Sequence, residues 1–337
     1  MPKTPSEKLY SLVKSLSGSE KRYFKIFANT KGGRDNKYIK LFDAVDKQEA
    51  FDEEKLKYII YGNDPIESRK YSELKAYLYE LILKSLQSFD EKSSVDYKLK
   101  GMLQSVRVLF KRSHFSDCKE ILQKAKKLAH KYEQFNSILD ILNWEKTIAY
   151  AETNIAFLDK EMDRINAEEE WCLQRLKNIS EYRNIFFKML LCIRKDVSRR
   201  KEQLEELKAL LQTPLLQDFD NAKSHTAQVL FQRIYSIYYF STADSLKFYD
   251  LNKKLITLLE SKTYLLKEDV SEYISVLNNH VIACGKMGKV NEIRVTLDKY
   301  SKVKPITIDD ELKILRQYYL GKFRLCINSG AFEEGYK

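Results

Sequence analysis

The sequence contains few of the residues that interrupt regular secondary structure, with only 10 glycines and 5 prolines among 337 residues. Sheet-rich folds need left-handed turn residues at short intervals, so this shortage argues against them. The five cysteines are odd in number and widely separated, which argues against a disulfide framework. We therefore expect an all-α protein with reduced, buried thiols in the cytoplasm.

Long apolar segments are also missing. Residues 1–13 already contain Lys3, Glu7 and Lys8, so we do not expect a secretory leader there. The longest uncharged stretch in the aromatic second half, residues 234–243, is far shorter than the roughly 20 residues that span a bilayer. We expect no membrane helix. With 44% hydrophobic and 32% charged residues, the chain can nevertheless bury a core.

Catalytic and cofactor motifs are absent too, including G-x-G-x-x-G, H-E-x-x-H and G-x-S-x-G. Residues 284–289 have part of the spacing of a phosphate-binding loop, but Val290 stands where that loop has a hydroxyl. His280 and Cys284 share one expected helix face, but a zinc site needs four groups and no partner pair is visible. We interpret both as core residues. We expect no enzyme activity, no cofactor and no metal.

From about Tyr97 onward, apolar residues recur at spacings of three and four, which predicts helices joined as repeated hairpins. Three second helices are expected to start with an apolar residue directly after a joint, at Phe115, Val290 and Phe332. The last two lie 42 residues apart, and the first two lie 175 apart, which is about four steps of 44. Such a period predicts a helical solenoid, in which neighbouring hairpins supply the core.

Individual apolar stripes predict the longer helices of this array. The stripe from Ile155 to Ile179 predicts a helix of about seven turns. A later stripe is expected to end at Pro214. The last stripe precedes a joint at residues 329–330 and consists of Leu312, Leu315, Tyr319, Phe323 and Cys326.

Residues 102–129 resemble the tetratricopeptide class of helix-hairpin repeats. Four residues occupy that family's positions for an aromatic, a small, a large apolar and a second small residue in the second helix: Phe115, Cys118, Leu122 and Ala125. The resemblance covers roughly residues 97–337. It implies a right-handed α-α superhelix whose concave groove holds another protein or a peptide. The family's peptide-binding residues are not carried over, because the matching positions here are structural.

Residues 1–96 do not follow the repeat, and we expect them to form an N-terminal helical domain that caps the array of residues 97–337. Capping signals such as Ser17-Gly18-Ser19-Glu20 mark the helix starts. The expected helices lie near residues 5–15, 18–28, 36–48, 52–61 and 66–89. Residues 52–89 also fit a helix-turn-helix unit with Tyr71 and Lys75 early in its second helix, so DNA reading stays open as the alternative.

The net charge of +11 is spread along the chain, but residues 21–40 carry seven basic side chains against Asp35 alone. A clustered positive field attracts phosphate or an acidic partner, although a solvated helix face is the ordinary explanation. The candidate contacts for an anionic partner or nucleic acid are Lys21, Arg22, Lys25, Arg34, Lys37, Lys40, Arg69 and Lys70.

We expect a non-catalytic scaffold that binds another protein or a peptide. The alternative is nucleic-acid binding or transcriptional regulation through the basic N-terminal domain. Residues 331–337 begin a second helix that stops after about two turns, so the last repeat is expected to be incomplete. Either a partner caps the array or, as we favour, the native protein continues. The oligomeric state stays open.

Overall fold

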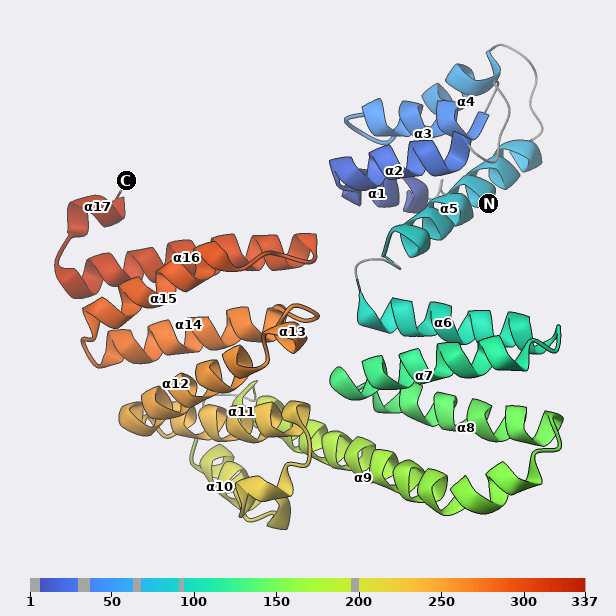
Figure 1. Cartoon of the computed structure of the whole chain (residues 1–337). Coiled ribbons are helices and arrows are strands. Elements are labelled where there is room, and N and C mark those ends of the chain that lie inside the picture. The colour runs from blue at the N-terminus through green and yellow to red at the C-terminus, as the bar shows by residue number, and fades with distance from the viewer. Residues whose placement is uncertain (1–6, 30–36, 63–67, 91–93, 195–199, 337) are drawn as a thin grey trace. The chain divides into compact units, whose positions relative to one another are not determined.

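The computed structural model describes residues 7–29, 37–62, 68–90, 94–194 and 200–336. Within these ranges the regular elements are helices α1 to α17 and short 3-10 turns, and no strand is present (Figure 1). This confirms the prediction of an all-α protein. No helix in the described part of the chain is both long and apolar enough to cross a membrane.

The chain divides into two compact units, Met1–Gly101 and Met102–Lys337. The first unit contains α1 (Lys8–Ser15), α2 (Gly18–Asn29), α3 (Lys37–Lys47), α4 (Glu53–Tyr61) and α5 (Ser68–Asp90). These helices lie where the capping signals and apolar spacing predict them. The predicted capping box at the start of α2 is present, because Ser17 and Glu20 exchange hydrogen bonds between side chains and backbone N–H groups.

Aromatic and aliphatic side chains from all five helices fill the core of the first unit. The rings of Phe24 on α2 and Phe42 on α3 lie 4.4 Å apart. Leu78 and Ile82 of α5 are fully buried, as is Leu56 of α4. Tyr71, which the helix-turn-helix alternative places early in its second helix, is also buried in this core.

The remaining helices follow in sequence: α6 (Val95–Phe110), α7 (Phe115–Lys131), α8 (Phe135–Ala151), α9 (Ile155–Arg194), α10 (Arg200–Leu211), α11 (His225–Ser241), α12 (Ser245–Ser261), α13 (Thr263–Leu266), α14 (Ser271–Lys286), α15 (Val290–Lys302), α16 (Ile308–Ser329) and α17 (Phe332–Tyr336). Each packs on near neighbours along the chain, with α8 on α7 and α9, α11 on α9 and α12, and α14 on α12, α15 and α16. The arrangement is a repeat-like series of helices. The helices α7, α15 and α17 begin at the predicted residues Phe115, Val290 and Phe332.

The joints between paired helices share one backbone geometry. At six joints a residue has a left-handed φ between 53° and 72°: Ser113, Glu133, Thr153, Ala243, Gly288 and Gly330. The N–H of the following residue donates to the carbonyl five residues earlier at 2.9–3.1 Å, which is the Schellman motif. The next helix then begins one residue later. The same turn therefore reverses the chain repeatedly through the second unit.

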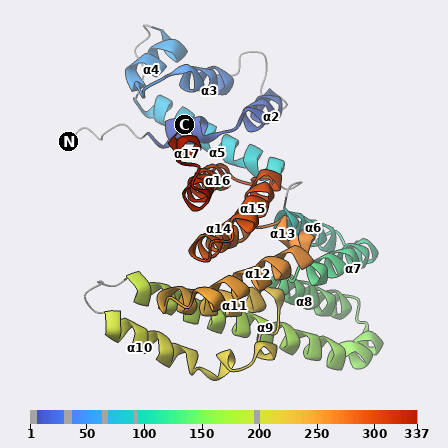
Figure 2. The ribbon, with the colours of Figure 1, turned by 90° about the vertical axis from the view of Figure 1, so that its left-hand side faces the viewer.

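Helix α9 is longer than its predicted seven turns, because it continues past Ile179 to Arg194 and reaches 40 residues, or about 60 Å. The apolar spacing does not stop at Ile179, since Tyr182 and Met189 are also buried. Along its length α9 packs first against α8 and then against α10 and α11 (Figures 1 and 2). Helix α10 ends at Leu211, before Pro214, as predicted.

Substituting Thr153 by glycine tests the shared joint. Thr153 is exposed and has φ 56°, a conformation that costs a β-branched residue about 1–2 kcal/mol. Glycine removes this strain but loses more backbone entropy on folding. We expect Thr153→Gly to stabilise the protein by about 0.5–1 kcal/mol in chemical denaturation followed by circular dichroism. Thr147→Gly, inside α8, is the matched control and should lower stability. A loss of stability in Thr153→Gly would contradict the assignment.

Candidate functional site

The most prominent feature of the second unit is an exposed apolar stripe on α16, which we call the open face. It consists of Ile308, Leu312, Leu315, Tyr319, Leu320, Phe323 and Ile327. Each of these side chains is between 47% and 63% exposed. Steps of three or four residues relate most of them, so they lie along one side of the helix.

The other side of α16 is also apolar, and it is covered. Ile314, Tyr318 and Leu325 pack against the core formed by α12, α14 and α15. Gly321 lets the helix approach closely, because a Cβ atom there would lie 2.7 Å from a methyl carbon of Leu297 on α15. Helix α16 therefore has one face that stabilises the fold and a second face of the same chemistry in contact with solvent.

Helix α14 also has two apolar faces, and neighbouring helices cover both of them. It lies between α12 on one side and α15 and α16 on the other. Ile274, Val276, Leu277 and Val281 are accordingly all buried. Soluble proteins rarely leave large contiguous apolar patches exposed unless the patch contacts a partner. The open face of α16 therefore has the composition of a buried helix face, although in the described second unit only the short helix α17 (Phe332–Tyr336) lies against it, near Phe323.

Charged residues flank the open face, with acidic residues at the start of α16 and basic residues further along it. Asp309 and Glu311 lie in the first turn of α16, where they complement the helix dipole. Arg316 and Lys322 are exposed further along the helix, among the apolar residues. Helix α17 adds the exposed aromatic ring of Phe332 beyond the end of α16. The surface is chemically suited to contact an apolar strip that carries acidic residues at its edge.

The basic residues predicted to bind anions are distributed over three helices of the first unit. On α2, Lys21 pairs with Asp46 of α3 at 2.7 Å, and Lys25 pairs with Asp43 of α3 at 2.7 Å. Arg22, between them, is exposed. Two cations of the expected cluster are therefore neutralised within the fold.

The other candidates lie on α3 and α5. The Lys37 ammonium lies 5.2 Å from the ring centre of Tyr61, and Lys40 lies one turn further along α3. Arg69 pairs with Glu73 one turn along α5 at 2.9 Å, and Lys70 is exposed. Arg34 lies outside the described residues. Lys75 pairs with Glu53 of α4, so it packs the two helices of the expected helix-turn-helix together.

Sequence reasoning identifies the α16 stripe but not its exposure. The stripe of Leu312, Leu315, Tyr319 and Phe323 has the same spacing as stripes that the structure buries. A usable signal is the second apolar set on the same helix, with Ile314, Tyr318 and Leu325. Two apolar sets on one helix show that it needs neighbours on both sides.

The chain matches no protein-family model, no curated protein and no solved structure.

Paired substitutions distinguish the two faces of α16. We expect Leu312→Gln on the open face to change the free energy of unfolding by no more than about 0.5 kcal/mol, because its side chain supports no core contact. Leu297→Ala, under the covered face, should cost about 2–5 kcal/mol by removing buried methyl groups. Chemical denaturation of both variants measures the difference. Equal destabilisation would show that the open face is needed for folding.

Proposed function

We propose that this protein is a non-catalytic scaffold that binds another protein through the open face of α16. In this proposal, helices α6 to α17 form the right-handed α-α superhelix that the resemblance to the tetratricopeptide class implies. The expected concave groove offers a second surface for a peptide. The open face is favoured because it exposes large apolar side chains that the described part of the fold leaves uncovered.

The geometry of the open face favours a helical partner segment. A straight strip of apolar residues along a helix is complemented by another amphipathic helix, whose apolar residues recur at steps of three and four. Tyr319 and Phe323 lie near the middle of the strip, where aromatic anchors contribute most to binding. Arg316 and Lys322 are exposed beside it and favour acidic residues at the edge of the partner helix.

Nucleic-acid binding through the first unit is the alternative proposal. It is supported by the basic residues of α2, α3 and α5, among which Arg22 and Lys70 are exposed. The pairing of Lys21 with Asp46 and of Lys25 with Asp43 weighs against it, because a paired ammonium offers less charge to a phosphate. Tyr71, in the second helix of the expected helix-turn-helix, is buried and is therefore not accessible to a nucleic acid.

Affinity purification of the full-length protein from its native lysate tests the scaffold proposal. One half of the lysate is treated with nuclease. We expect a protein partner in stoichiometric amount that survives nuclease and whose recovery falls at least tenfold in the double variant Leu315→Glu, Tyr319→Glu. The control double variant Leu173→Glu, Phe187→Glu changes exposed apolar residues of α9 and should retain the partner. A partner that the open-face variant still retains at wild-type level would overturn the proposal.

A binding titration against duplex and single-stranded DNA tests the alternative. If the scaffold proposal holds, the full chain should bind DNA only non-specifically, with a dissociation constant of about 10⁻⁶ M or weaker at physiological salt. The variant Arg22→Glu, Arg69→Glu leaves the ion pairs of Lys21 and Lys25 in place. A change in its DNA affinity therefore reports lost contacts to DNA rather than loss of the fold. Tight binding that this variant abolishes would instead establish the first unit as a nucleic-acid site.

A further inference from the structure

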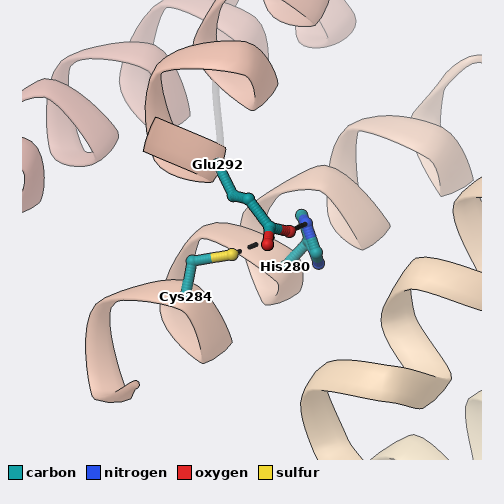
Figure 3. A group of neighbouring side chains, drawn as sticks. All are labelled: His280, Cys284 and Glu292. Atoms are coloured by element: carbon teal, nitrogen blue, oxygen red, sulfur yellow. Dashed lines mark hydrogen bonds and ion pairs between the residues drawn. The ribbon is translucent and has the colours of Figure 1, made fainter. Parts of the chain in front are cut away.

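Three side chains with metal-ligating atoms meet where α14 joins α15 (Figure 3). The His280 Nε2 atom lies 3.5 Å from the Cys284 Sγ atom and 3.7 Å from a carboxylate oxygen of Glu292. All three ligand atoms lie within 4.8 Å of one another. The sequence shows His280 and Cys284 as a pair, and the structure adds Glu292 as the third group.

The repeated joint explains why these residues meet. His280 and Cys284 are one turn apart and lie on the same side of α14. The left-handed residue Gly288 reverses the chain, so the first turn of α15 returns beside the end of α14. Glu292 lies in that first turn. The cluster is therefore fixed by two helices and a hydrogen-bonded turn.

Two of the three distances between ligand atoms agree with a tetrahedral zinc site. Ligand atoms held 2.0–2.3 Å from Zn²⁺ at tetrahedral angles are separated by about 3.3–3.7 Å. The distances from His280 to Cys284 and to Glu292 are 3.5 and 3.7 Å. A thiolate with an imidazole selects Zn²⁺ over Mg²⁺ and Ca²⁺, which prefer oxygen ligands only. The charges of one thiolate and one carboxylate balance those of the ion.

The cluster of His280, Cys284 and Glu292 is buried on one side and reaches solvent at Glu292. His280 and Cys284 are buried, whereas the Glu292 side chain is 36% exposed. The Tyr249 hydroxyl donates to the Glu292 carboxylate at 2.6–2.7 Å and its ring stacks on His280. Such outer contacts orient metal ligands.

A charged group also lies beside the cluster. The Lys289 ammonium lies 3.6 Å from the Glu292 carboxylate and balances its charge before an ion binds.

We propose that His280, Cys284 and Glu292 form a Zn²⁺ site with a fourth position left for water. Binding replaces the thiol proton of Cys284, which leaves to solvent, and forms one bond from the ion to each of the three side chains. The ion would connect α14 to α15. This inference does not rest on the partner-binding proposal, because the cluster shares no residue with the open face.

Titration of the metal-free full chain with Co²⁺, which reports thiolate ligation by its charge-transfer absorption, tests the site. We expect a one-to-one complex that Zn²⁺ displaces. Cys284→Ser should abolish the thiolate absorption, and Glu292→Gln should weaken binding at least tenfold. The control Cys172→Ser removes a buried thiol on α9 and should bind as the wild type does. Zn²⁺ should raise the melting temperature of the wild type and of the control, but not of Cys284→Ser.

Two results of the Co²⁺ titration would contradict the proposed site. Absence of thiolate absorption in the folded wild type would do so, as would its retention in Cys284→Ser. Because a buried substitution can disturb folding, circular dichroism is recorded for each variant. Glu292→Gln changes a half-exposed residue and tests the site even if Cys284→Ser unfolds, and wild-type metal affinity in that variant would contradict the proposal.

Discussion

Reversal of the chain within a few residues is the constraint on which the second unit depends. Each of six joints places one residue in the left-handed region and satisfies the carbonyls at the helix end with the same two hydrogen bonds. Because the next helix starts at a fixed distance from that residue, successive helices fold back at a defined register. The apolar faces then meet without long loops. Both candidate sites follow from this geometry.

Stacking of hairpins also determines which surfaces stay exposed. A helix inside the series has neighbours on two sides and needs two apolar faces, as α14 does between α12 and α16. Helix α16 has the same two-faced composition, but within the described second unit the short helix α17 alone lies against its open face, near Phe323. Burying such large apolar side chains would release free energy at about 25 cal/mol per Å². The open face therefore exists because α16 has the two apolar faces of a helix inside the series, while one of these faces stays largely exposed.

The helical class and many helix starts were predictable, because the period of three and four residues is a local property of the sequence. The joint before Phe115 was located from the apolar residue that follows it, although Ser113 adopts a left-handed conformation usually marked by glycine. The extension of α9 to Arg194 was missed although no glycine or proline follows Ile179 within the helix. The exposure of the α16 stripe and the approach of Glu292 to His280 depend on packing between separate helices. Spacing along one helix carries no information on either.

The proposed zinc site and the open face are mechanically related through α14 and α15. Val281 of α14 and Leu297 of α15 both contact the position where Gly321 seats α16. His280 is the residue next to Val281, and Glu292 lies little more than one turn before Leu297. An ion held by His280, Cys284 and Glu292 would therefore restrain the two helices on which the covered face of α16 rests. Since the open face belongs to the same rigid helix, its orientation is set by that support.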